Sequence, residues 1–138
     1  MKWFEHSPLK PISSADTPSI FSSNSQNRLD WSSFPILVRP YEGGHLPLKR
    51  AEKKCQQLEN LALAVTELAN KRVSSEGLRI VDFCSGGGHL AILLAYLMPQ
   101  STIYLVENKP ESLECAIERV QKLQLSNCCF FQGMQRSR

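Results

Sequence analysis

Long hydrophobic runs are absent from this 138-residue chain. No stretch approaches the roughly 18 apolar residues that a membrane-spanning helix needs. No apolar run follows Lys2 either, as one would in a signal peptide. We therefore expect neither a membrane protein nor a secreted precursor.

Cysteines are few, and they lack the spacing of a metal site or of a disulfide framework. Their number, five, is odd, and none forms a Cys-x-x-Cys pair. Cys128 and Cys129 are adjacent, so in a strand their side chains would face opposite ways. We expect no bound metal and a reducing compartment, with the cytoplasm as the default location.

An excess of charge of one sign is also missing. The formal net charge is +3, from 16 basic and 13 acidic residues, and this alone does not indicate a nucleic-acid-binding protein. Basic residues do gather at one predicted helix start. Four of them, Lys49, Arg50, Lys53 and Lys54, are offset there by a single acidic residue, Glu52. Two readings stay open: a solvated helix face, or a patch for RNA or another phosphate polymer.

Residues 1–40 are rich in serine and proline and show no apolar period. Such a segment buries too little surface to offset its ordering entropy, so a mostly disordered leader is expected. Within it, Trp31 and Phe34 should anchor an extended stretch, 31–38, on the domain surface. The domain itself is expected over residues 41–138.

Apolar periodicity predicts a helix over residues 48–71, followed by an α/β unit with a parallel sheet. The apolar stripe of the helix is expected at Cys55, Leu58, Leu61, Val65 and Leu68, with Ala62 and Ala69 beside them. Strands are predicted at 78–83, 103–106 and 128–131. A helix that is apolar almost all round is predicted at 90–98, and another from about 110 to 123. On this last helix, Arg119 and Lys122 should stay outside.

Three glycines, Gly86 to Gly88, follow the first predicted strand, and Glu107 ends the second. Glycine in a strand-to-helix turn lets the backbone take positive φ and lets a ligand approach closely. Gly86 and Glu107 are 21 positions apart, near the roughly 20 residues between a glycine turn and a ribose-binding acid. The pattern predicts a site for a nucleoside-containing cofactor.

The run Asp82-Phe-Cys-Ser-Gly-Gly-Gly88 resembles the first motif of class I S-adenosylmethionine-dependent methyltransferases, an acid followed by three alternating glycines. Cys84 stands where that family usually has glycine, and Glu107 stands where it has its ribose-binding acid. The similarity covers Trp31 to Gly133. It implies a Rossmann-like parallel sheet, S-adenosyl-L-methionine as cofactor, and methyl transfer by a full-length form.

The resemblance also implies roles at the carboxyl ends of the strands, where parallel sheets bind ligands. Backbone N–H groups of Gly86 and Gly88 would approach the methionine moiety, and Asp82 would attract its ammonium. Glu107 would accept both ribose hydroxyls, and Asn108 would flank the adenine. The expected cofactor-binding residues are Asp82, Cys84, Ser85, Gly86, Gly88, Glu107 and Asn108.

Two neighbouring positions carry narrower expectations. Cys84 is expected to be a small buried residue that narrows the pocket, rather than a reactive thiol. His89 could act as a general base beside the pocket, but a role in capping the following helix is the preferred reading.

Parts of the family pattern are missing from the sequence. Gln132, Gly133 and Met134 stand where the third strand usually presents an acid to the adenine, and no fourth-strand motif follows. We therefore expect the first half of a methyltransferase domain, inactive by itself, with no catalytic residue to name. The methyl acceptor is open among RNA, protein and small molecule, and the oligomeric state is open too.

Two other functions are considered. Gly86-x-Gly88-x-x-Ala91 satisfies a permissive dinucleotide fingerprint, which would indicate an NAD(P)-binding unit. Asp82, however, is unusual in dehydrogenases. A catalytically inactive interaction module that keeps the fold and the basic helix is the third reading.

Overall fold

The computed structural model describes residues 29–71 and 77–133. The elements in chain order are η1 (Trp31–Ser33), η2 (Ile36–Val38), α1 (Leu48–Asn70), β1 (Arg79–Phe83), α2 (His89–Leu97), β2 (Thr102–Glu107), α3 (Pro110–Lys122) and β3 (Cys128–Gln132). The predicted order of strands and helices is confirmed. Most of the expected disordered leader, residues 1–28, lies outside the described residues, as does Met134.

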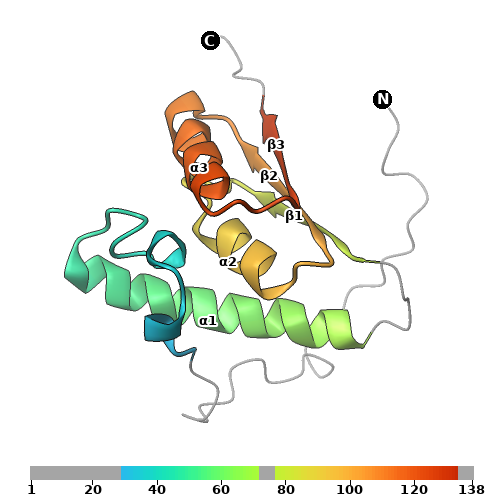
Figure 1. Cartoon of the computed structure of the whole chain (residues 1–138), viewed down its shortest axis with the longest axis horizontal. Coiled ribbons are helices and arrows are strands. Elements are labelled where there is room, and N and C mark those ends of the chain that lie inside the picture. Colours follow the sequence, from blue (N-terminus) through green and yellow to red (C-terminus); the bar gives the residue numbers. More distant parts are fainter. Residues whose placement is uncertain (1–28, 72–76, 134–138) are drawn as a thin grey trace, which may run out of the picture.

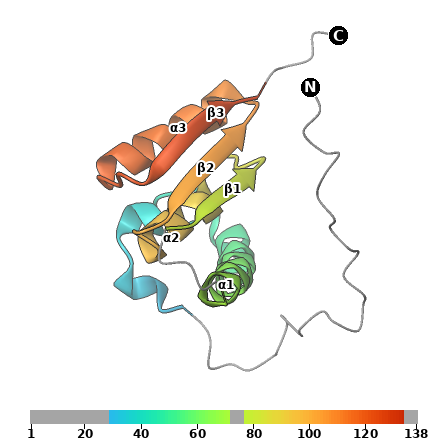
Figure 2. The ribbon, with the colours of Figure 1, turned by 90° about the vertical axis from the view of Figure 1, so that its right-hand side faces the viewer.

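The three strands form one parallel sheet in the order β1-β2-β3, which confirms the predicted fold class. Val81 pairs with Tyr104, and Leu105 pairs with Phe130. Figures 1 and 2 show α2 and α3 on the same face of this sheet, with α1 running past α2 on the β1 side. Parallel neighbours need a crossover connection, and here each crossover is a helix.

The core lies between α2 and its neighbours. Residues 91–95 of α2 are all buried, as are Ile103 and Leu105 of β2. An apolar helix of this kind must be covered on more than one side, and the sheet and α1 provide that cover. No described helix is both long and apolar enough to cross a membrane.

The buried face of α1 agrees with the predicted stripe at Leu58 and Ala62, but not at Leu61 and Leu68. Ala51, Leu58 and Ala62 are buried, whereas Leu61 and Leu68 are 41% and 62% exposed. The buried face is thus rotated away from Leu61 and Leu68, toward Ala51 and Ala62. The expectation that Leu61 and Leu68 face the core was therefore wrong.

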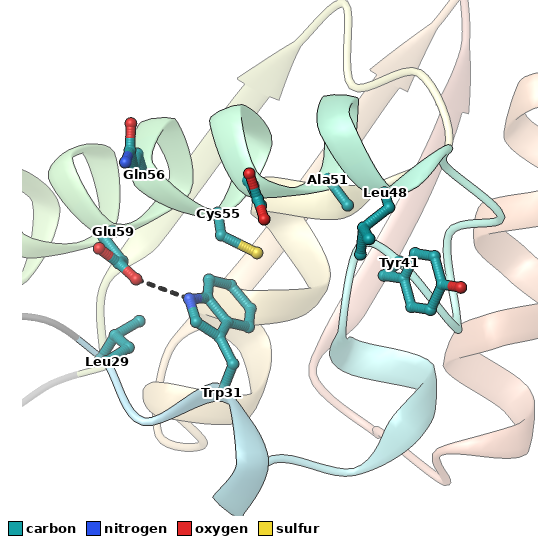
Figure 3. A pocket seen from close by; sticks show the side chains of 9 residues that line it. Leu29, Trp31, Tyr41, Leu48, Ala51, Cys55, Gln56 and Glu59 are labelled. Carbon is teal, nitrogen blue, oxygen red and sulfur yellow. Dashed lines mark hydrogen bonds between the residues drawn. The ribbon is translucent and has the colours of Figure 1, made fainter.

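The segment before α1 packs as two short 3-10 turns and not as the expected extended stretch. Phe34 and Val38 are buried in the core, so Phe34 is an anchor as predicted. Trp31 packs against the core as well, and its indole Nε1 donates a 2.6 Å hydrogen bond to Glu59 Oε1 of α1. Figure 3 shows the indole reaching toward Glu59 and Cys55 in a cavity of about 510 Å³ between the two segments.

The sheet face opposite the helices is apolar and uncovered by any described residue. It carries Val81 and Phe83 of β1, which are 46% and 73% exposed, and Phe131 of β3, which is 53% exposed. Tyr104 lies between them, with its ring centroid 5.9 Å from that of Phe131. Contiguous exposed apolar surface of this kind is unusual on a monomeric protein.

Replacing both phenylalanines of this face, Phe83→Thr with Phe131→Thr, should lower the binding of an apolar-surface dye several-fold. It should also reduce self-association in sedimentation. Threonine is well tolerated in strands, so far-UV circular dichroism should not change. The control is Leu68→Thr, because Leu68 is equally exposed but lies on α1. Equal dye binding by the double variant and the original chain would contradict this prediction.

Candidate functional site

The ends of the three parallel strands meet at one edge of the sheet. Phe83 of β1 pairs with Val106, and Glu107 of β2 pairs with Gln132 of β3. This register sets the glycine turn after β1 beside the end of β2. The predicted site residues therefore lie along one edge, as a parallel sheet requires.

Glu107 ties the end of β2 to the glycine turn. Its Oε2 accepts a 2.7 Å hydrogen bond from the Gly86 N–H, and its Oε1 accepts bonds of 2.9 Å from the N–H groups of Asn108 and Lys109. The side chain is only 7% exposed. These donors, led by Lys109 and Gly86, hold the pKa of Glu107 below its ordinary value, so the carboxylate is ionised at neutral pH.

Gly86 and Gly88 have different roles in the turn. Gly86 has φ +54°, and a Cβ added there would meet nothing within 4 Å, so its α-carbon faces open space. Gly88 has φ +77°, and an added Cβ would lie 2.9 Å from Ala116 Cβ. Gly88 is thus required for close packing of the turn on α3, as well as for its backbone conformation.

The N–H groups of these two glycines are not free for a ligand, contrary to the expectation. Gly86 donates to Glu107, and Gly88 donates to Ser85 O at 2.9 Å. The Gly87 N–H has no hydrogen-bond partner within residues 29–71 and 77–133. Gly87 is therefore the glycine of the turn that offers a donor.

Cys84 and Ser85 lead into the turn. Cys84 is exposed, so the expectation of a small buried residue was wrong. Its φ of +60° lies in the left-handed region that favours glycine, which is the residue its family position usually carries. Ser85 is buried, and its Oγ finds no hydrogen-bond partner among the described residues. A buried hydroxyl without a partner is costly unless a ligand or water satisfies it.

Asp82, near the end of β1, is half-buried beneath the turn. Burial raises its pKa above the ordinary value, and the negative charge of Glu107 adds to that increase. A hydrogen bond with the backbone of Ala91 and the positive charge of Lys54 act in the opposite direction. The Ala91 contact places the carboxyl against the first turn of α2.

His89 is the first residue of α2, but its side chain does not cap that helix. Its imidazole lies against Gly44, where an added Cβ would come within 2.9 Å of Nδ1. Nδ1 is buried and has no partner among the described residues. Burial, and then the charges of Arg119 and Lys54, lower the pKa of His89 to about 4, so it is neutral at pH 7.

Arg119 was expected outside but is only 6% exposed, so that expectation was wrong. Its guanidinium donates to Leu37 O at 2.7 Å through Nη2 and at 3.1 Å through Nε, and to Gly87 O at 2.9 Å through Nη1. Burial lowers its pKa to about 10, so it stays charged at neutral pH. Arg119 thereby joins α3 to both the glycine turn and the segment before α1.

Sequence reasoning missed Arg119 because its partners are carbonyl oxygens, which any residue provides. The helical period placed it beside Ala116 and Val120, on the edge of the inward face, and that was the available signal. A cavity of about 270 Å³ lies behind the turn and is lined by Arg119, His89, Gly44 and Gly87 among others.

The remaining edge residues are open. Asn108 is exposed, and an added Cβ on Gly133 would lie 3.5 Å from Asn108 Cβ. Gln132 is exposed as well. The part of the edge near β3 therefore has no carboxylate at position 132 or 133, where Gln132 and Gly133 stand.

Metal and thiol chemistry find little support in the described part of the chain. It holds no cluster of three or more histidine, cysteine or acidic side chains able to bind a metal ion. Burial raises the pKa of the Cys55 thiol, and Glu59 and Glu52 add to it. Burial, and then the charge of Cys129, raise the pKa of the Cys128 thiol to about 11. Neither thiol is a thiolate at neutral pH.

A family model described as a methyltransferase domain matches residues 74–135. The glutathione S-transferase C-terminal domain-containing protein homolog of Drosophila pseudoobscura pseudoobscura is 45% identical over 126 residues, or 91% of this chain and 20% of the relative. The Mus musculus protein is 48% identical over 105 residues, or 76% of this chain and 16% of the relative. The chain thus spans about a fifth or less of these relatives.

Among solved structures, coclaurine N-methyltransferase bound to N-methylheliamine and SAH is similar with a TM-score of 0.43. The sequence identity is 19%, over 55% of this chain and 23% of that enzyme.

Replacing Arg119 by methionine should lower the free energy of unfolding by about 2 kcal/mol, because the half-buried Leu37 O and Gly87 O would lose their charged donor. Arg119→Lys should not restore it, since a single ammonium cannot reproduce the guanidinium fork. Urea unfolding measures both. The control is Lys122→Met on the same helix, where only an exposed ion pair with Glu118 is lost. Equal effects at the two positions would contradict the role of Arg119.

Replacing Glu107 by glutamine should lower the free energy of unfolding by about 1–3 kcal/mol at pH 7. The side-chain NH₂ group would then face a backbone N–H group, and two donors cannot form a hydrogen bond. The folded-state pKa of Glu107 is lowered, so its stabilisation is present above the ordinary value of 4.5 and is lost as pH falls through the lowered pKa. The difference between the two chains should therefore shrink in acid. Urea midpoints across that pH range measure it, with exposed Glu114→Gln as control. A difference that does not change with pH would refute the proposed cause.

Proposed function

We propose that the edge at Gly86 and Glu107 binds S-adenosyl-L-methionine. The match of residues 74–135 to a family model described as a methyltransferase domain supports this, as does the similarity to the glutathione S-transferase C-terminal domain-containing proteins. Methyl transfer itself is proposed for a full-length form.

The observation that carries the proposal is the hydrogen bond between Glu107 Oε2 and the Gly86 N–H. It sets an ionised, nearly buried carboxylate beside a glycine whose α-carbon faces open space. Such a carboxylate suits a hydroxyl donor, because an ionised oxygen makes stronger hydrogen bonds than a neutral one. A ribose ring lying over Gly86 would meet this acceptor.

The number of free acceptor positions on Glu107 limits how the ribose is held. An ionised carboxylate offers about four lone-pair positions, and three backbone N–H groups already use the carboxylate. One further hydroxyl fits at Oε2. A second ribose hydroxyl would have to replace one of the three N–H donors. The sequence predicted that Glu107 accepts both ribose hydroxyls, but its carboxylate must be shared between the ribose and the backbone N–H groups.

The methionine end of the cofactor is assigned to the other side of the turn. Asp82 supplies a carboxylate for the ammonium group, and Ser85 Oγ and the Gly87 N–H supply unused polar groups. Asn108, exposed beyond Glu107, is assigned to the adenine. When bound, the cofactor supplies an electrophilic methyl group, and the contribution of these residues is to hold and orient it.

The NAD(P) alternative is disfavoured by the same hydrogen bonds. A pyrophosphate in a dinucleotide fold is bound by free backbone N–H groups at the glycine turn and helix start. Here the N–H groups of Gly86 and Gly88 are already donated within the protein, which leaves that of Gly87 as the free donor among the three glycines in the described part of the chain.

Calorimetric titration of the full chain with S-adenosylhomocysteine and with NAD tests the proposal. Saturable binding of S-adenosylhomocysteine with no response to NAD is expected. Tight NAD binding without binding of S-adenosylhomocysteine would overturn it. Binding of neither ligand to a cooperatively folded chain would favour an interaction module.

Replacing Asp82 by asparagine should weaken S-adenosylhomocysteine binding about tenfold or more, a loss of roughly 1.4 kcal/mol. It should not lower the thermal midpoint at pH 7. The folded-state pKa of Asp82 is raised, so its favourable contribution exists in acid and is lost as pH rises through that pKa. Asparagine avoids this loss. Glu114→Gln is the control, and a variant that loses stability but keeps affinity would contradict the assignment.

A further inference from the structure

A basic cavity lies between the start of α1 and the start of α2. Its volume is about 520 Å³, and it is lined by Leu46, Arg50, Lys53, Lys54, Gln57 and His89. No carboxylate belongs to this lining. Glu52, the acidic residue of the same helix turns, lines the cavity on the Trp31 side instead. The lining therefore carries three basic side chains and no acidic one.

The stability of α1 does not account for these cations. The positive end of the helix dipole lies at its start, so lysine and arginine there are electrostatically unfavourable. The first turn of α1 nevertheless contains no acidic residue. Arg50, Lys53, Lys54 and Gln57 follow one another at intervals of three, one and three positions, which sets them on one helix face.

The cations of the cavity are also free to bind. Arg50 and Lys53 are exposed, and neither side chain has a hydrogen bond or ion pair with the described part of the chain. Lys54 donates a 3.2 Å hydrogen bond to Gln57 Oε1, which leaves the Gln57 amide nitrogen unused. His89 is neutral at pH 7 and adds a polar wall rather than a charge.

The cavity adjoins the proposed cofactor site. His89 lines it and directly follows the glycine turn. Lys54 lies close enough to Asp82 for its charge to act on that carboxyl. A ligand held in the cavity would therefore lie beside the glycine turn on which the proposed cofactor site is built.

We propose that this cavity binds the phosphate backbone of single-stranded RNA and that RNA is the acceptor class. The assignment of an acceptor, though not the binding itself, rests on the proposed cofactor site. Arg50 and Lys53 contact phosphates, and the free Gln57 amide donates to a ribose 2′-hydroxyl, the group that distinguishes RNA from DNA. A single strand fits because a base must leave a duplex before an enzyme can modify it.

Fluorescence polarisation of a labelled single-stranded RNA with the full chain tests this. The double variant Arg50→Gln, Lys53→Gln should bind about tenfold or more weakly at low salt. Its plot of log affinity against log salt should be shallower by about 1.4, since each lost single-strand phosphate contact is worth about 0.7. The matched control, Lys71→Gln with Lys122→Gln, removes the same charge at two positions outside the lining of this cavity and should match the original chain.

Competing ligands identify the source of the anion. Inorganic phosphate and a polyglutamate peptide should compete poorly, and single-stranded DNA should bind more weakly than RNA. Equal binding of DNA and RNA, preference for the peptide, or unchanged RNA binding by the cavity variant would each overturn the proposal.

Titration with S-adenosylhomocysteine separates this proposal from the previous one. The cavity variant should keep its affinity for that ligand. If RNA binding depends on Arg50 and Lys53 but the chain does not bind S-adenosylhomocysteine, the proposed RNA site is supported and the proposed cofactor site is refuted. The reverse pattern would keep the cofactor site alone.

Discussion

The hydrogen bond between Glu107 and the Gly86 N–H holds the end of β2 against the turn that follows β1. Two strands of a parallel sheet are joined along their length by backbone bonds, but the loops beyond their ends are not. The buried carboxylate extends that connection past the sheet, and its two further donors, Asn108 and Lys109, set the start of α3 as well. The geometry of the candidate site depends on this one ionised group.

Arg119 performs the corresponding task on the other side of the turn. It binds Gly87 O and Leu37 O, so α3, the glycine turn and the segment before α1 share one buried guanidinium. Gly88 completes the arrangement, because only a residue without a Cβ packs this closely against Ala116. The turn is thus held by an anion, a cation and a steric fit. Gly86 is left facing open space, and the Gly87 N–H is left without a partner in the described part of the chain.

The two faces of the sheet are unequal. One is covered by α2 and α3, while Val81, Phe83 and Phe131 on the other are exposed. The polar features gather elsewhere, along the carboxyl edge and in the basic cavity between α1 and α2. The exposed apolar surface and the candidate ligand-binding residues therefore lie on different parts of the structure.

The sequence by itself determined the order of strands and helices, the glycine turn and the acid at the end of β2. Those features follow from local periodicity and from a spacing of 21 positions within one βαβ unit. It did not determine that Leu61 faces outward, that Glu59 is buried beneath Trp31, or that Arg119 lies inside. Each of these depends on a partner far along the chain, 28 positions away for Glu59 and 82 for Arg119 and Leu37. Such contacts form only when the elements pack, so only the tertiary structure decided them.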